Sequence, residues 1–177
     1  MVTLLIFDEE KQSCNLLCIN RDTMVEMPKL NRHGKVTGTQ VAQLALSHTF
    51  GYGMEDSCVN TRTTISNLLY GLQIDYYLAM TMDAVAVLND SVGGVTVNVR
   101  DDFSAFDPSI KMGQMTLHGR QALNFVQARG GVGDQLAISR VERHKEYMSG
   151  FVTALKEKAE DSSTFVLKTY GEVSDYI

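Results

Sequence analysis

The sequence lacks any apolar run that approaches the roughly 20 residues a helix needs to span a membrane. It also lacks a signal peptide, and its three cysteines, an odd number, exclude a closed disulfide framework. Only two prolines occur and 44% of the residues are hydrophobic, which excludes disorder as the dominant state. At 177 residues, the chain is expected to fold as about one globular domain.

Motifs of several common enzyme classes are missing as well. The four histidines are scattered, and neither Cys-x-x-Cys nor His-Glu-x-x-His occurs, so no zinc motif is readable. The Gly-x-Ser-x-Gly motif of many hydrolases and the nucleotide-binding P-loop are also absent. The chemistry of this chain must therefore come from other residues.

The charge balance is mildly acidic. Sixteen Lys and Arg against 21 Asp and Glu give a net charge of −5 and an isoelectric point near 5.3. A chain of this kind is a poor general binder of nucleic acid or anionic membranes, so we expect no nucleic-acid partner. If the chain handles phosphate, it must do so with a local group of its arginines.

Strands and helices alternate along the predicted order, which indicates an α/β fold. Apolar runs, helical spacing and capping residues predict the individual elements. These are strands at 2–7, 14–19, 74–82 and 95–99, an extended stretch at 24–28, a loop at 31–38, helices at 40–50, 56–70, 84–89 and 119–129, and a long helix that starts at Ser139. The order strand, helix, strand over 74–99 favours some parallel pairing. We expect one domain at 1–160, with 161–177 as its tail in the form of a short helix or strand.

The first candidate for chemistry is Arg21-Asp22-Thr23, which directly follows a strand-like apolar run. Sheets of the α/β class bind ligands at the carboxyl ends of their strands, where this charged pair is expected to lie. The alternative is that Arg21 and Asp22 support a turn on the surface. Position alone leaves both interpretations open.

The second candidate lies at two helix ends joined by a glycine-rich loop. Arg129 ends one predicted helix, while Arg140 and Arg143 begin the next on one face, with His144 beside them. Guanidinium groups make bidentate, charge-assisted hydrogen bonds to phosphate, and a helix N-terminus favours an anion. The alternative is that these arginines pair with acidic neighbours on a solvated face, namely Asp134, Glu142 and Glu146.

Four short motifs follow one another along the chain. A strand ends in Arg-Asp-Thr at 21–23, and a central segment carries Ile-Asp-Tyr-Tyr at 74–77 and Val-Gly-Gly-Val-Thr-Val at 92–97. A helix with Leu-x-Gly-x-Gln-Ala-Leu follows at 117–123, and Gly-Asp with Arg-x-x-Arg closes the series at 133–143. This order, over roughly residues 2–155, resembles the LytR-CpsA-Psr family of bacterial cell-envelope proteins.

The resemblance implies a fold and an activity. The fold is α/β, with a central mixed β-sheet flanked by helices and an apolar pocket for a lipid. The activity is that of a phosphotransferase, which moves a glycopolymer (teichoic acid or capsular polysaccharide) from a polyprenyl-pyrophosphate carrier to a peptidoglycan sugar hydroxyl, with pyrophosphatase as a side activity. Members are usually anchored to the membrane by an N-terminal helix, act on its extracytoplasmic face, and use a divalent ion, normally Mg²⁺.

The resemblance also assigns roles to residues of this chain. The catalytic residues it implies are Arg21, Asp22, Arg129, Asp134 and Arg140, and the pyrophosphate ligands are Arg21, Arg129, Arg140, Arg143 and His144. Asp134 would either orient one of the arginines or accept the proton of the acceptor hydroxyl. These two roles cannot be separated from the sequence.

The sequence departs from the family pattern in three ways. Gln127 stands where many members have Arg, and His144 stands where Gln is common. The chain opens directly into the strand-like run 2–7, which suggests that the segment with the acidic Mg²⁺ ligands and the membrane helix precedes residue 1. The resemblance therefore leaves open whether this chain is active by itself.

Two alternative functions come from other classes of protein. A non-catalytic member would bind polyprenyl phosphate without turnover, or regulate envelope assembly, and Gln127 favours this alternative. A transcription regulator is disfavoured by the acidic charge and by the lack of a helix-turn-helix signal.

Overall fold

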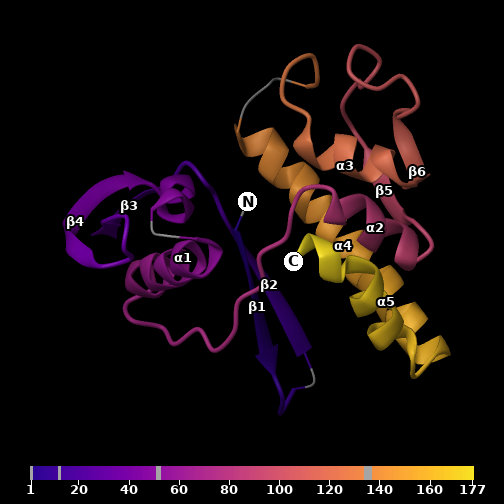
Figure 1. Cartoon of the computed structure of the whole chain (residues 1–177). Coiled ribbons are helices and arrows are strands. Elements are labelled where there is room, and N and C mark those ends of the chain that lie inside the picture. The colour runs from indigo at the N-terminus through magenta and orange to yellow at the C-terminus, as the bar shows by residue number, and fades with distance from the viewer. Residues whose placement is uncertain (1, 12, 51–52, 134–136) are drawn as a thin grey trace. The chain divides into compact units, whose positions relative to one another are not determined.

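The structure is a computed structural model that describes residues 2–11, 13–50, 53–133 and 137–177. Its elements form two compact units, Met1–Ala79 and Met80–Ile177, which follow one another along the colour bar of Figure 1. Each unit combines helices with short strands, so the expected α/β class is confirmed. None of the described helices is long and apolar enough to cross a membrane.

The first unit begins with two neighbouring strands, as the apolar runs predicted. β1 (Val2–Asp8) and β2 (Ser13–Ile19) pair antiparallel along their whole length. Their connection is short and polar, and Lys11 donates its backbone N–H and its Nζ to the carboxylate of Asp8, at 3.0 and 2.8 Å. β2 ends at Ile19, just before the candidate pair Arg21-Asp22.

A second antiparallel pair is formed by β3 (Met24–Leu30) and β4 (Val36–Gln43). The turn between them is held by Asn31, whose Oδ1 accepts hydrogen bonds from backbone N–H groups two and four residues further on. Asn suits this position because its short side chain can bond the backbone locally. The loop predicted at 31–38 is therefore shorter than expected.

The helix predicted at 40–50 is wrong. Residues 40–43 belong to β4, and Leu44–Thr49 form the short 3₁₀ helix η1. The apolar positions that suggested helical spacing belong to two different elements. Val41 is exposed on β4, whereas Leu44 of η1 is buried in the core. An apolar run this short carries too little periodicity to separate helix from strand.

α1 (Met54–Leu68) confirms the helix predicted at 56–70. Just beyond the end of α1, Gly71 donates its N–H to the carbonyl of Ser66. Gly71 has φ +82°, a left-handed conformation that glycine adopts without strain. One face of α1 packs on β3 and η1. The buried core of this unit consists of Ile19, Val25, Met27, Leu44 and Ile65.

The strand predicted at 74–82 is also wrong, because this stretch has no regular secondary structure. Most of its side chains are exposed, including those of Tyr76, Leu78 and Met82. Aromatic and alternating residues favour a strand only where a neighbouring strand and a packed face receive them. Among the strands that the structure describes, none pairs with this stretch.

The second unit contains an antiparallel pair, β5 (Val95–Val99) with β6 (Gly113–Leu117). The parallel pairing expected over 74–99 is therefore wrong, and the described strands form three two-stranded antiparallel sheets. The helices of this unit are α2 (Ala84–Ser91), α3 (Arg120–Gln127), α4 (Ala137–Asp161) and α5 (Phe165–Val173), followed by the 3₁₀ helix η2 (Ser174–Tyr176). The helices predicted at 84–89 and 119–129 and the long helix are confirmed, and the tail is helical.

The core of the second unit forms around β5. Its three valines are buried while Thr96 and Asn98 are exposed, as the strict alternation predicted. α4 crosses β5 at Gly150, where an added Cβ would lie 2.5 Å from the carbonyl oxygen of Thr96. Any larger residue at position 150 would push the helix away from the strand.

We therefore expect Gly150→Ala to lower the free energy of unfolding by about 1–3 kcal/mol, the usual cost of overpacking a well-packed interior. Urea unfolding of the purified chain measures this change. Gly171→Ala is the matched control, because Gly171 also lies in a helix but an added Cβ there meets nothing within 4 Å. The control should be neutral or slightly stabilising, since alanine favours helix. Equal effects of the two substitutions would contradict the close approach.

Candidate functional site

The residues predicted for the site lie in both units. Arg21 and Asp22 belong to the first unit, and the arginines 129, 140 and 143 with His144 belong to the second. Asp134 lies outside the described residues. Convergence of the two groups on one site stays a prediction.

Arg21 and Asp22 occupy a tight turn between β2 and β3. Asn20 shapes this turn, because its Oδ1 accepts the backbone N–H of Asp22 at 3.0 Å and its carbonyl accepts that of Thr23 at 3.1 Å. Arg21 Nε lies 3.8 Å from Asp22 Oδ1, and both side chains are partly exposed. The charged pair therefore stands at a strand end, as predicted, with its polar atoms accessible from the surface.

The second group gathers where α3 ends and α4 begins. The last carbonyls of a helix have no partner within the helix. Here two successive side chains of α4 supply donors: Arg143 Nη2 binds the carbonyl of Ala128 at 2.7 Å, and His144 Nε2 binds that of Val126 at 2.7 Å. A carbonyl can only accept, so His144 carries its proton on Nε2. The start of α4 is thereby joined to the end of α3.

Arg143 is buried, with 8% of its surface exposed. Its Nη1 lies 2.8 Å from Asp101 Oδ2, and its guanidinium carbon lies 5.8 Å from the ring centroid of Phe103. The phenyl ring of Phe103 stacks in turn on Phe125 of α3, with centroids 5.5 Å apart. The contact of Arg143 with pyrophosphate stays a prediction, and the structure adds a set of internal contacts for the same side chain.

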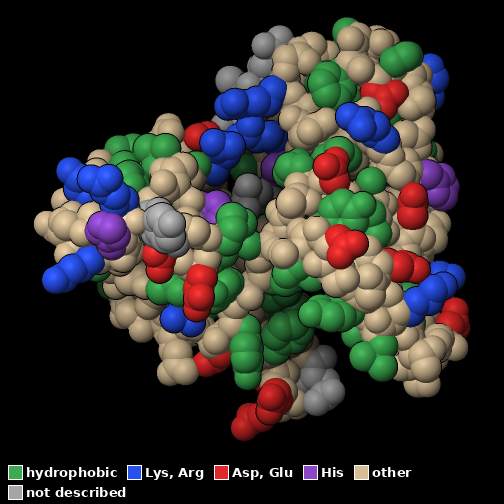
Figure 2. All heavy atoms as spheres, viewed as in Figure 1, with side chains coloured by type: hydrophobic (Ala, Val, Ile, Leu, Met, Phe, Trp, Pro, Cys, Tyr) green, Lys and Arg blue, Asp and Glu red, His purple; other side chains and the backbone are tan. Residues whose placement is uncertain are grey.

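Arg129 and Arg140 flank this buried arginine. Arg129 is exposed and directly follows Ala128, the residue that Arg143 holds, while Arg140 is half-buried one helical turn before Arg143. Lys and Arg side chains gather on the face where α4 begins (Figure 2). The second unit thus joins the two helix ends that carry these arginines, and convergence of their guanidinium groups stays a prediction.

Two of the three alternative partners proposed for these arginines have other partners in the structure, and the third, Asp134, lies outside the described residues. Glu142 pairs with Lys145 at 2.8 Å, and Glu146 accepts the backbone N–H of Asn98 at 3.0 Å and lies 3.7 Å from Arg100. Sequence reasoning did not find Asp101 and Phe103. The one local signal for them was the pair Asp101-Asp102, which follows the strand 95–99 after a single arginine.

The described residues do not form a metal site of their own, because no three His, Cys, Asp or Glu side chains among them come together to hold an ion. The described residues by themselves therefore offer no Mg²⁺ site, so binding of this ion stays a prediction and we derive no step through it.

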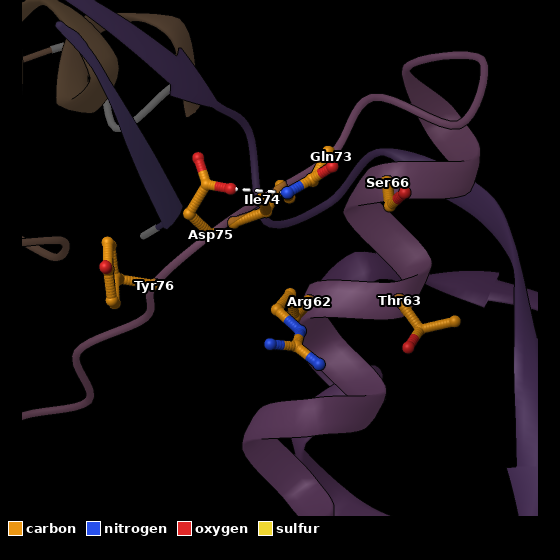
Figure 3. A pocket seen from close by; sticks show the side chains of 7 residues that line it. All are labelled: Arg62, Thr63, Ser66, Gln73, Ile74, Asp75 and Tyr76. Atoms are coloured by element: carbon orange, nitrogen blue, oxygen red, sulfur yellow. Dashed lines mark hydrogen bonds between the residues drawn. The ribbon is translucent and has the colours of Figure 1, made fainter.

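A pocket of about 540 Å³ lies in the first unit between α1 and residues 73–76 (Figure 3). Arg62 extends from α1 toward this stretch and stacks on Tyr77 at 5.8 Å, while Gln73 donates to Asp75 at 2.6 Å. A second pocket of about 570 Å³ lies beside β5, β6 and α4. Polar side chains dominate the lining of both, so neither matches the apolar lipid pocket, which stays a prediction.

Comparison with known proteins identifies the family. Residues 1–177 match the LytR_cpsA_psr family over their whole length. The chain belongs to the LytR-CpsA-Psr family. This agrees with the four motifs in the sequence.

Curated relatives of this LytR-CpsA-Psr chain include proteins named polyisoprenyl-teichoic acid–peptidoglycan teichoic acid transferase TagU. That of Oceanobacillus iheyensis is 28% identical over 166 residues, which is 92% of this chain and 46% of the relative. That of Bacillus subtilis is 27% identical over 135 residues, or 75% of this chain and 41% of the relative. The chain therefore spans less than half the length of these two relatives.

Solved structures share the fold. A protein from Streptococcus agalactiae, gbs0355, has a TM-score of 0.77 at 20% identity, covering 98% of this chain and 58% of that one. TagU of Bacillus subtilis has a TM-score of 0.65 at 23% identity, covering 98% of this chain and 69% of that one. At this level of identity the likeness establishes the fold.

His144 gives the junction a dependence on pH. Burial lowers the pKa of His144, the charges of Arg140 and Arg143 act in the same direction, and the hydrogen bond to Val126 opposes them. The folded chain therefore resists protonation of this ring, whereas the unfolded chain does not. The free energy of unfolding should be highest above the ordinary histidine pKa of about 6.5 and should fall as the pH drops toward the lower pKa of the folded state.

His144→Gln tests this dependence, because glutamine keeps a donor for the carbonyl of Val126 but does not titrate. Urea unfolding of both proteins at about pH 7.5, 6.5 and 5.5 isolates the contribution of this residue. We expect the variant to gain stability relative to wild type as the pH falls. A difference in unfolding free energy that stays constant across this range would contradict a neutral His144 in the folded chain.

Proposed function

We propose that this chain carries the phosphotransferase activity of a glycopolymer ligase, which transfers teichoic acid or a capsular polysaccharide from a polyprenyl-pyrophosphate carrier to peptidoglycan. The observation that carries the proposal is the junction of α3 and α4, where internal contacts fix Arg143, Arg129 directly follows Ala128, and Arg140 lies one helical turn before Arg143. The membership of the whole chain in the LytR-CpsA-Psr family supports it, as does the similarity to relatives named TagU teichoic acid transferases.

In the proposed reaction, the oxygen of a sugar hydroxyl attacks the phosphorus that bears the glycopolymer. A new phosphodiester bond forms, the pyrophosphate P–O bond breaks, and polyprenyl phosphate leaves with the bonding electrons. Charge shifts onto the pyrophosphate oxygens as this happens, and donors fixed in advance stabilise it. Arg129 and Arg140 suit this role, because their guanidinium groups approach from two helix ends whose positions are set by internal contacts.

Arg21 and Asp22 would complete the site from the first unit. An arginine at a strand end can bind the second phosphate group, and Asp22 lies close enough to orient it. The proton of the acceptor hydroxyl requires a base, for which Asp134 is the candidate by sequence. A polyprenyl donor and a peptidoglycan acceptor would place the activity at the outer face of the cell membrane, and Mg²⁺ is the proposed cofactor.

The second candidate function is binding of polyprenyl phosphate without turnover. Gln127 favours it, because this exposed side chain donates to Asn124 Oδ1 at 3.2 Å and adds no positive charge beside Arg129. Such a protein would hold the lipid-linked chain, or regulate its delivery, and would release no polyprenyl phosphate.

Arg129→Ala should lower kcat for glycopolymer transfer by about 100-fold, the usual effect of removing one preorganised donor to a developing charge. The assay follows a labelled glycopolymer from a polyprenyl-pyrophosphate donor to peptidoglycan with Mg²⁺ present, and repeats it with a chelator. Arg120→Ala is the matched control, because it removes the same charge from the exposed opposite end of α3. It should leave kcat unchanged.

Three outcomes separate the candidate functions. Transfer that depends on Arg129 but not on Arg120 supports the phosphotransferase. Tight binding of the donor without release of polyprenyl phosphate supports the binding protein. Transfer at equal rates in wild type and Arg129→Ala would rule out the proposed role of the junction.

A further inference from the structure

We infer that Asp101 is a positioning residue, which acts through Arg143 to fix the loop 128–133 and with it the reactive arginine Arg129. Its kinetic consequences rest on the proposed function, whereas the fixing of the loop by Asp101 does not depend on that function. Asp101 follows β5 and lies 42 residues before Arg143 in the sequence, so no local motif connects them. The two residues meet because α4 packs across β5.

The first step is the fixing of Arg143. Its guanidinium lies between Asp101 Oδ2 at 2.8 Å and the carbonyl of Ala128 at 2.7 Å, above the ring of Phe103. Only 9% of the Arg143 side chain is exposed, so its charge depends on Asp101 for compensation. A buried charge that loses its partner is strongly unfavourable. Arg143 therefore takes its orientation from Asp101, and Ala128 takes its position from Arg143.

The second step is a direct contact between Asp101 and the loop. Gly133 lies against the carboxylate, and a Cβ at this position would come within 2.8 Å of Asp101 Oδ1. Gly133 also has φ +59°, a left-handed conformation in which a side chain would be strained. Asp101 thus packs against the loop at Gly133 and fixes it at Ala128 through Arg143.

The third step concerns what the loop carries. Between these two points Val132 is buried in the core, with 1% of its surface exposed, while Arg129 and Gly130 are exposed. The loop is therefore fixed at Ala128, at Val132 and at Gly133. The exposed Arg129 directly follows the first of these residues. A shift of about 1 Å in a group that stabilises a transition state can lower the rate by two orders of magnitude. Asp101 then affects the reaction without touching the substrate.

Asp101→Asn tests the inference, with Arg100→Gln as the matched control. Arg100 is the neighbouring residue, largely exposed, and its ion pair with Glu146 is longer, at 3.7 Å. Amide hydrogen exchange of residues 128–133, measured on the purified chain, should be at least about tenfold faster in Asp101→Asn and unchanged in Arg100→Gln. Unchanged exchange in the loop of Asp101→Asn would overturn the inference, whatever the chain does catalytically.

A double-mutant cycle measured by kinetics then distinguishes a positioning role of Asp101 from a loss of folded protein. Asp101→Asn should lower kcat about tenfold or more in wild type, with little change in KM, but less than about twofold in the Arg129→Ala background. A purely structural role would lower kcat by the same factor in both backgrounds and would contradict the inference. Gly133→Ala, which leaves both charges in place, serves as the second variant if Asp101→Asn does not fold, and the same cycle with Arg129→Ala applies to it. If the wild-type chain transfers nothing, the proposed function fails, and hydrogen exchange alone decides the positioning role.

Discussion

The second unit depends on how the carbonyl groups at the end of α3 find their donors. The chain leaves the helix at Ala128, and water is excluded there because Ala128 and Phe125 are buried. Two side chains of α4 fill this need, and one of them is a cation, which is also favourable at the C-terminal end of a helix dipole. That cation in turn requires an anion within the protein. The carbonyl groups at the end of α3 therefore require Arg143, and the buried charge of Arg143 requires Asp101.

Arginine is suited to this position in a way that lysine is not. Its planar fork reaches a carboxylate and a carbonyl at the same time, and its flat face stacks on the ring of Phe103. An ammonium group also has several donors, but it lacks the planar fork that reaches both partners and the flat face that stacks on the ring. The geometry that makes guanidinium a good ligand for phosphate also makes it a good internal connector. An arginine in a motif can therefore serve the architecture of a site, the substrate, or both.

The sequence was most informative where the signal was local. The strict alternation of 95–99 and the apolar stripe of the long helix were enough to predict β5 and α4, and the spacing of Arg140 and Arg143 indicated a shared face. It was least informative where the secondary structure of a stretch depends on whether another strand pairs with it. The stretch 74–82 has the composition of a strand but none of the described strands beside it, and 40–43 became a strand because β3 pairs with it.

The role of Asp101 could not be predicted for the same reason. Its partner lies far away in the sequence, and the carboxylate of an Asp-Asp pair after a strand gives no hint of a buried cation. The motifs singled out the arginines at the helix ends, and their role in the reaction stays a prediction. They could not tell which guanidinium faces inward, because that depends on the way α4 crosses the sheet.

The close approach at Gly150 has a consequence for how this region can vary. Gly150 meets Thr96, and Arg143 meets Asp101, so α4 is attached to one strand and its extension at two places seven residues apart. Seven residues are close to two full turns, so both places lie on the same side of the helix. Inserting or deleting one residue between them would rotate one attachment by about 100° relative to the other. Length changes between residues 143 and 150 should therefore not be tolerated, because this part of the helix sets the spacing between its two attachments.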